Sequence, residues 1–158
     1  MKILLIIVVI AALFYTIQRA MDKKSTASSA DNIKAGEVFL AENELKKGVE
    51  KTESGLQYVV LTKGTGTNHP AATAKVTVHY HGTLIDGTVF DSSIDRGEPI
   101  TFGLNQVIKG WTEGVQLMVV GDKMRFFIPS NLAYGNKSAG TIKGGSTLIF
   151  DVELIAIK

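Results

Sequence analysis

Cysteine is absent from this chain of 158 residues, so disulfide bonds, thiolate catalysis and zinc–thiolate sites are excluded. An excess of charge is absent as well, since 17 lysine and arginine residues stand against 15 aspartate and glutamate residues, for a net charge of +2. A nucleic-acid-binding domain usually carries a basic stripe, so we expect no nucleic-acid partner. Because an ordinary domain holds about 100–150 residues, the chain has room for one domain and a leader.

Sequence patterns for two common enzyme classes are also missing. The glycine-rich segments 64–66 and 144–146 are not followed by a helix and a lysine at the spacing of a phosphate-binding loop, which argues against nucleotide binding. Ser92 and Ser93 follow Asp91 without a histidine base in the same motif, which argues against a hydrolase.

Three histidines raise the question of a metal site. His79 and His81 share one strand face, and His69 lies upstream, but no third ligand or carboxylate is spaced to complete a site. We therefore expect no metal and no cofactor, with metal handling by these histidines as an alternative.

The N-terminus carries an uncharged and almost wholly apolar run at residues 3–17. A helix from Lys2 through Arg19 would be roughly 27 Å long at 1.5 Å per residue. This length is close to the thickness of the hydrocarbon core of a bilayer, about 30 Å. Charged residues follow directly, beginning with Arg19, and the nearest small-x-small cleavage sequence, 28–30, lies too far away. We predict that residues 1–20 are an uncleaved inner-membrane anchor; a cleaved secretory leader is the alternative.

Residues 21–50 are predicted to be a linker with a short helix. Residues 19–30 are rich in serine, alanine and charge, which suits a flexible segment. Apolar residues recur at helical spacing between Asp31 and Lys47, with Asp31 as the N-cap and Gly48 as the residue that ends the helix.

Residues 51–158 are predicted to form a mostly β domain. Alternating apolar and polar residues turn Tyr80 inward and His79 and His81 outward. Asp86 and Gly87 predict a two-residue type I′ hairpin turn, which needs positive φ at both positions. One short helix is expected in the domain core, over 111–118. Strand patterns occur at 56–61, 75–84, 88–90, 123–128 and 148–155.

The predicted fold class is therefore α+β. It combines an antiparallel twisted β-sheet, wrapped around one short helix, with a preceding N-terminal hydrophobic anchor helix.

Four segments together resemble one known family. The segment 76–93 carries an inward tyrosine, a phenylalanine and an aspartate. The segment 106–111 adds two aliphatic residues and a tryptophan, 132–135 adds a second tyrosine, and 147–154 adds another phenylalanine. In this order they resemble the FKBP-type peptidyl-prolyl cis-trans isomerases, over about residues 53–158. The segment 39–58 is similar to the junction before the catalytic domain in bacterial macrophage infectivity potentiator-like members. Those relatives carry a long helical dimerisation region, and a much shorter stretch stands here, so we expect a monomer.

The resemblance implies a peptidyl-prolyl cis-trans isomerase that needs no cofactor. Trp111 would form the floor under the proline ring, Tyr134 and the backbone N–H of Ile108 would donate hydrogen bonds to the peptide, and Arg96 would keep Asp91 ionised. The implied catalytic residues are Tyr80, Phe90, Asp91, Trp111, Tyr134 and Phe150. The implied substrate-binding residues are Arg96, Phe102, Val107, Ile108 and Ile142.

The implied partners are proline-containing polypeptides and the macrolide inhibitors of the family. The chain departs from the common pattern at Ile100, where many members have an aromatic residue, at Ser138, where many have a histidine, and at Lys143, where a proline is frequent. Substrate preference and macrolide affinity are therefore expected to differ from the typical member. Exported bacterial relatives favour a periplasmic catalytic domain. A non-enzymatic proline-peptide-binding module or chaperone that uses the same pocket is the alternative function.

Overall fold

The computed structural model of the chain describes the backbone of residues 2–158 and the side chains of residues 11–23 and 28–158. Its helices are α1 (Lys2–Glu44), α2 (Ser93–Arg96), α3 (Lys109–Gln116) and the short 3₁₀ turns η1 (Leu104–Gln106) and η2 (Ser130–Leu132). Its strands are β1 (Glu50–Lys51), β2 (Gln57–Thr62), β3 (Lys75–Leu84), β4 (Val89–Ser92), β5 (Ile100–Gly103), β6 (Lys123–Ile128) and β7 (Leu148–Ile157).

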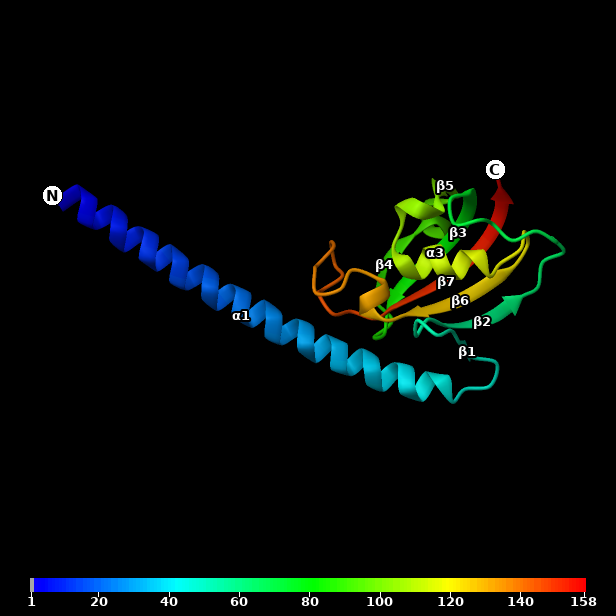
Figure 1. Ribbon diagram of the computed structural model, residues 1–158, viewed down its shortest axis with the longest axis horizontal. Helices are drawn as coiled ribbons and strands as arrows, with labels where there is room; N and C mark the ends of the chain where they lie inside the picture. Colours follow the sequence, from blue (N-terminus) through cyan, green and yellow to red (C-terminus); the bar gives the residue numbers. More distant parts are fainter. Residues whose placement is uncertain (1) are drawn as a thin grey trace.

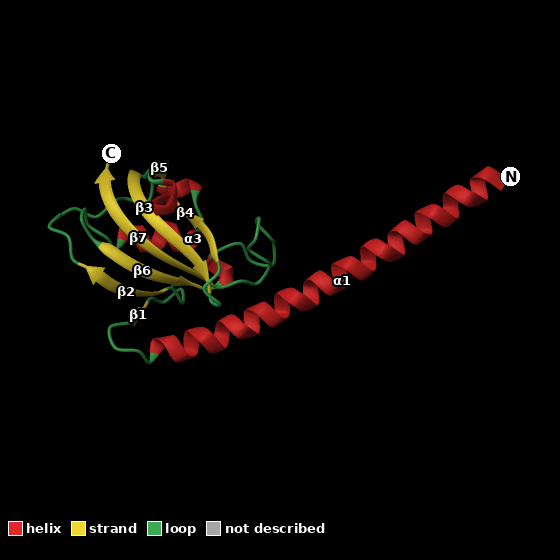
Figure 2. Ribbon diagram, turned by 180° about the vertical axis from the view of Figure 1, so that it is seen from behind, coloured by secondary structure: helices red, strands yellow, loops and turns green. Residues whose placement is uncertain are grey.

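The strands form one antiparallel sheet that curves around α3 (Figures 1 and 2). Its order is β1-β2-β6-β7-β3-β4, and β5 also pairs with β3. The long strands β3 and β7 lie side by side in the middle, and β4 and β5 share the other edge of β3. The antiparallel sheet around one central helix confirms the expected class of the domain.

Helix α3 packs unusually close to the sheet because two of its glycines face β6. A side-chain carbon at Gly110 would lie 2.5 Å from Ile128, and one at Gly114 would lie 2.8 Å from Phe126. These glycines let Trp111 and Val115, which are both buried, reach the hydrophobic core. The helix runs two residues earlier than the predicted 111–118, and the one-turn helix α2 was not predicted.

Alternation along β3 holds as predicted, but the turn that follows it differs. Tyr80 is buried with Val76 and Val78, and the two histidines face the other side. The predicted type I′ turn at Asp86 and Gly87 does not form. It needs positive φ at both residues, and only Gly87 has it (87°), since no residue other than glycine has positive φ in the described chain. The carboxylate of Asp86 accepts the N–H of Thr88 at 2.9 Å, which supports a wider loop with the left-handed position at Gly87 alone.

Helix α1 is one continuous helix, and its C-terminal half docks on the domain. Asn43 donates to the side chain of Gln57 at 2.9 Å, and Gln57 donates to the carbonyl of Leu40 at 2.9 Å. Phe39 packs against Phe127 with ring centroids 6.1 Å apart. The N-terminal half projects away from the domain (Figures 1 and 2).

The predicted flexible linker at residues 19–30 and the separate helix after it are therefore wrong. No glycine or proline interrupts residues 19–30, so nothing in the backbone stops the helix. Docking near residue 32 also favours continuity, since Asn32 donates to the carbonyl of Gly144 at 2.8 Å. The helix ends at Glu44, and Gly48, the predicted stop, lies in the following turn with φ of 84°.

The anchor predicted at residues 1–20 lies in part, at 1–10, outside the residues whose side chains are described. Over the part of the chain that is described, no helix has the length and apolar character to cross a membrane.

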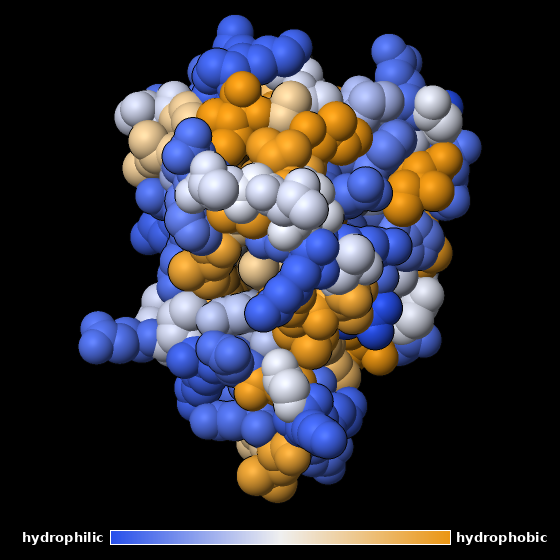
Figure 3. Space-filling view, turned by 90° about the vertical axis from the view of Figure 1, so that its right-hand side faces the viewer, coloured by the Kyte–Doolittle hydropathy of each residue, from blue (hydrophilic) through white to orange (hydrophobic). Residues whose placement is uncertain are grey.

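The domain surface carries scattered apolar residues. On the face shown in Figure 3, they form patches separated by hydrophilic residues. Such scattered exposure is normal for a folded domain, so surface hydropathy alone does not locate the site.

Candidate active site

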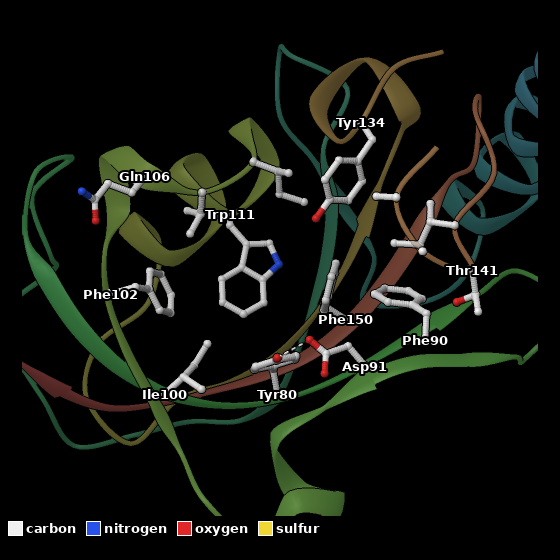
Figure 4. Close-up of a pocket in the computed structure, with 15 residues that line it drawn as sticks. Tyr80, Phe90, Asp91, Ile100, Phe102, Gln106, Trp111, Tyr134, Thr141 and Phe150 are labelled. Carbon is white, nitrogen blue, oxygen red and sulfur yellow. Dashed lines mark hydrogen bonds between the residues drawn. The ribbon is translucent and has the colours of Figure 1, made fainter. Parts of the chain in front are cut away.

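A pocket of about 700 Å³ opens between α3, the concave face of the sheet and the loop before β7. Most of its lining is apolar, and Figure 4 shows the aromatic side chains converging on it from separate elements. The lining residues are Tyr80, Phe90, Asp91, Ile100, Phe102, Gln106, Val107, Ile108, Trp111, Tyr134, Ala139, Gly140, Thr141, Ile142 and Phe150.

Trp111 is the centre of this pocket. Its ring lies edge-on to Tyr80, with centroids 5.3 Å apart, and to Phe150, with centroids 5.1 Å apart. Phe102 packs beside it at 5.4 Å, and Phe90 reaches the other side of Phe150 at 5.2 Å. Edge-to-face contacts of this kind hold rings rigidly, so the floor and walls are preformed.

A glycine on β3 makes room for two of these rings. A side-chain carbon at Gly82 would lie 2.7 Å from the ring of Phe90 and 2.8 Å from that of Phe150. Real side-chain carbons essentially never approach so closely. The position of both walls therefore depends on glycine at residue 82.

The indole nitrogen of Trp111 is buried and has no hydrogen-bond partner among the described residues. It points to the Phe150 side of the pocket (Figure 4). Buried donors without a partner are rare in folded proteins, and a role at a functional site is one explanation for them.

One polar group interrupts the apolar wall. The hydroxyl of Tyr80 donates to the carboxylate of Asp91, and Arg96 donates both to that carboxylate and, at 2.9 Å, to the Tyr80 hydroxyl. The Arg96 guanidinium also lies 5.7 Å from the centre of the Tyr80 ring. Asp91 and Arg96 are both about half exposed, so this group sits where the pocket meets solvent.

These contacts shift the three pKa values. Partial burial acts to raise the pKa of Asp91, but hydrogen bonds from Tyr80 and Arg96 and the charge of Arg96 outweigh it, so the pKa lies below its ordinary value. Burial and then the hydrogen bond to Asp91 raise the pKa of Tyr80. Hydrogen bonds to Tyr80 and Asp91 raise the pKa of Arg96. Near neutral pH, Asp91 is therefore an anion paired with a cation, which is a poor general base.

The structure brings together every predicted site residue except one. Arg96 does not line the pocket and acts behind Tyr80 and Asp91. Tyr134 stands at the rim, with 42% of its surface exposed, and Ile142 is buried in the loop opposite.

Five further residues line the pocket: Ile100, which was noted only as a departure from the family pattern, and four that were missed. Gln106 belongs to a motif used for the resemblance, but its side chain was assigned no role. Ala139, Gly140 and Thr141 lie in a tight turn closed by hydrogen bonds between Ala139 and Ile142, at 2.8 and 3.0 Å. This turn has no hydrophobic period, so only its place next to Ile142 could have identified it.

The histidines do not form a metal site in the described chain. His79 and His81 each place a ring nitrogen 2.9 Å from a serine hydroxyl, of Ser93 and Ser92 respectively. Among the residues searched, no three His, Asp or Glu side chains lie close enough to hold an ion.

Comparison with known proteins identifies the family. Residues 66–155 match the family described as FKBP-type peptidyl-prolyl cis-trans isomerase, and residues 8–60 match the domain amino terminal to it. The isomerase FkpA of Aeromonas hydrophila is 61% identical over 85% of this chain and 50% of its own length. The outer membrane protein MIP of Legionella longbeachae is 48% identical over 81% of this chain and 55% of its own.

The fold agrees with these matches. The crystal structure of FkpA from Escherichia coli superposes with a TM-score of 0.89 at 40% identity, over 94% of this chain and 70% of that one. The chain spans about half the length of the curated relatives it matches. On the family match, which covers strands β3 to β6, most of β7, helix α3 and the pocket, the chain belongs to the FKBP-type peptidyl-prolyl cis-trans isomerase family.

Proposed function

We propose that this chain is a peptidyl-prolyl cis-trans isomerase that accelerates rotation about Xaa-Pro bonds in other polypeptides. The observation that carries the proposal is the preformed aromatic pocket around Trp111, which is closed on its sides and open at the rim. Xaa-Pro bonds are the peptide bonds that populate both the cis and the trans form, and the exchange between the two forms is slow enough to limit folding.

The pocket fits the physical chemistry of this reaction. Rotation has a barrier of about 18–20 kcal/mol and breaks no covalent bond, so no nucleophile is required. The twisted amide has lost resonance, and its oxygen carries less negative charge than in the planar form. An apolar site therefore binds the twisted form better than the planar one, and catalysis is this difference in binding. An acceleration of about 10⁴ to 10⁶ needs only about 5–8 kcal/mol.

Each group in the pocket has a proposed part. Trp111 is the floor under the proline ring, with Tyr80, Phe90 and Phe150 among the walls. Phe102 backs the floor, and Val107 and Ile108 close the side next to α3. Tyr134 donates from the rim to a peptide carbonyl, and the backbone N–H of Ile108 donates to another. Asp91 positions Tyr80 and sets the local charge, and it takes no proton from the substrate.

The second candidate is a non-enzymatic proline-peptide-binding module or chaperone with the same pocket. A protease-coupled assay with a proline peptide separates the two. We expect the full-length protein to speed isomerisation in this assay, and binding of the peptide without acceleration would favour the module. The macrolide inhibitors of the family are proposed to occupy the same pocket and to compete with the peptide.

We further propose that the N-terminal run holds the protein at the inner membrane, with the domain on the periplasmic side. Leu13, Phe14, Tyr15 and Ile17 are each at least half exposed on α1, so these large apolar side chains have no cover from the domain. The outer membrane protein MIP, a relative, is a protein of the cell envelope by its name. Carbonate extraction of membranes tests attachment, and a reporter fused at the C-terminus tests the side.

We propose a monomer, since a pocket that is complete in one chain gives the reaction no need of a second copy. The sequence favoured a monomer because it predicted only a short stretch before the domain, and that prediction is wrong, since α1 runs for 43 residues. Light scattering of detergent-solubilised full-length protein tests the proposal, and a stable dimer would contradict it.

A further inference from the structure

The edge of β3 behind the pocket has a gap that no strand fills. On this edge, β5 pairs with β3 up to Val78, and β4 pairs with it from His81 onward. Tyr80 lies in the gap, because β4 ends at Ser92 and the chain turns into α2. A buried backbone N–H or carbonyl without a partner is costly, so the gap has to be closed by other groups.

Two buried serine hydroxyls close it. The hydroxyl of Ser93 accepts the backbone N–H of Tyr80 at 2.7 Å and lies 3.3 Å from the carbonyl of the same residue. The hydroxyl of Ser92 lies 3.5 Å from that carbonyl. Ser93 is fully buried and Ser92 is 5% exposed. Side chains from the start of α2 thus stand where the backbone of a pairing strand would stand.

The two histidines beside Tyr80 hold these hydroxyls from the outer face of the sheet. The Nδ1 atom of His79 lies 2.9 Å from the Ser93 hydroxyl, and that of His81 lies 2.9 Å from the Ser92 hydroxyl. Two polar partners on each hydroxyl leave little freedom of rotation.

One of these serines, Ser92, also sets the direction of α2. Ser92 is the N-cap of this helix, and its hydroxyl accepts the N–H of Asp95 at 3.2 Å. Gly97 closes the other end in the left-handed conformation, with φ of 74°. A helix of one turn has no stability of its own, so its geometry depends on its caps. Arg96, which contacts Asp91 and the Tyr80 hydroxyl, is the last residue of this turn.

We propose that Ser92 and Ser93 are positioning residues for the isomerase reaction, and that they hold Tyr80, Asp91 and Arg96 in register through the backbone of Tyr80 and the cap of α2. His81 and His79 act through the two serines. This inference rests on the proposed function for its kinetic test, and its structural test is independent of activity.

The kinetic test uses the full-length protein with Ser92→Ala, Ser92→Thr and Arg96→Met. Ser92→Ala should lower kcat about threefold to tenfold, the size expected when one cap hydrogen bond that positions a catalytic group is lost. KM should stay within about twofold, because the N–H of Tyr80 keeps its hydrogen bond to Ser93 and the wall stays in place. Ser92→Thr keeps a hydroxyl at the N-cap and should restore kcat.

A double-mutant cycle separates positioning from general stability. In the Arg96→Met background, Ser92→Ala should lower kcat less than it does in the wild type, since one of the groups that Ser92 positions is gone. The matched control is Thr77→Val, which removes the 2.7 Å hydrogen bond between Thr77 and Thr101 on β3 and β5, away from Asp91. This control should leave kcat unchanged even where the melting temperature falls as much as in Ser92→Ala.

A spectroscopic measurement tests the proposal without turnover. The guanidinium signals of Arg96 in ¹⁵N NMR should exchange slowly in the wild type and in Ser92→Thr, and quickly in Ser92→Ala. If Ser92→Ala does not fold, His81→Val replaces it, with an expected fall in kcat of about twofold to fourfold.

Unchanged kcat and unchanged Arg96 signals in Ser92→Ala would overturn the proposal, as would an equal loss of kcat in the Arg96→Met background. An inactive wild type would count against the proposed function alone, and the Arg96 signals would then decide between a positioning role and none.

Discussion

Replacing Gly82 with alanine should disturb the pocket without removing any of its side chains. The added methyl group would lie 2.7 Å from the ring of Phe90 and 2.8 Å from that of Phe150. Neither ring is a flexible chain end, and Phe150 also packs edge-on against Trp111. The rings therefore have to shift together, which moves a wall and the floor of the pocket at once.

The size of the effect follows from overpacking. Inserting a methyl group into a well-packed core costs about 1–3 kcal/mol of unfolding free energy. For a chain of this length, each kcal/mol lowers the melting temperature by about 2–4 °C. If the pocket loses only part of its fit to the twisted amide, kcat/KM should fall about tenfold to a hundredfold, or about 1.4–2.7 kcal/mol.

Gly87→Ala is the matched control. Gly87 has φ of 87° and an exposed hairpin position, and no atom lies within 4 Å of an added side-chain carbon. An alanine held in the left-handed region costs about 1–2 kcal/mol, so this variant should lose similar stability. It should keep the kcat/KM of the wild type, because the hairpin tip does not line the pocket.

The assay is the protease-coupled isomerisation of a proline peptide, with thermal melts recorded by Trp111 fluorescence. A Gly82→Ala protein with wild-type kcat/KM would show that the rings move aside without harm. An equal loss of kcat/KM in Gly87→Ala would show that stability, and not the pocket, limits the reaction. Either result would refute the reasoning from close packing.

Three further predictions concern the charge, the floor and the helix. Asp91→Asn should bind a proline peptide almost as well as the wild type does. Its turnover should fall by about one to two powers of ten, where each power of ten is about 1.4 kcal/mol. Complete loss of turnover with intact folding would contradict a positioning role. The pKa of Asp91 is lower in the folded state than in the unfolded state. The contribution of Asp91 to stability is therefore fully present above the unfolded pKa of about 3.9, and it is lost only as pH falls through the lower folded pKa. We expect kcat/KM to be flat around neutral pH, and a carboxylate titration there would indicate a general base. Trp111→Leu should retain an apolar floor and part of the activity, which steady-state kinetics can check. Residues 51–158 alone should fold and keep activity, but with about 1–3 kcal/mol less unfolding free energy in a urea titration, because Gln57 loses its hydrogen bonds to Asn43 and Leu40.

The sequence predicted the pocket well because its residues lie on elements with a clear period. Alternation along β3 and β7 turned Tyr80 and Phe150 to the same face, and the helical spacing of α3 placed Trp111 against them. The match of motif order to the family supplied Tyr134 and Ile142, which no period would have shown.

What failed depends on tertiary contacts or on single side chains. The turn at Asp86 followed the usual preference of an Asp-Gly pair, but the Asp86 carboxylate holds the N–H of Thr88 and favours another loop. Composition suggested a flexible segment at 19–30, whereas the absence of a helix breaker and the docking of Asn32 on Gly144 favour helix. Residues 139–141 line the pocket through a turn that leaves no trace in hydropathy.

The docking of α1 has a geometric consequence for the pocket. About 11 residues of this helix, 18–28, separate the apolar run at 3–17 from Ser29, a buried residue of its docked half, and at 1.5 Å per residue they form a spacer of about 16 Å. Since the docked half is pinned to β2 and to the loop before β7, the spacer fixes the direction of the pocket mouth as well as its distance. Whatever holds the N-terminus therefore also sets how far away, and at what angle, a client chain must pass to reach Trp111.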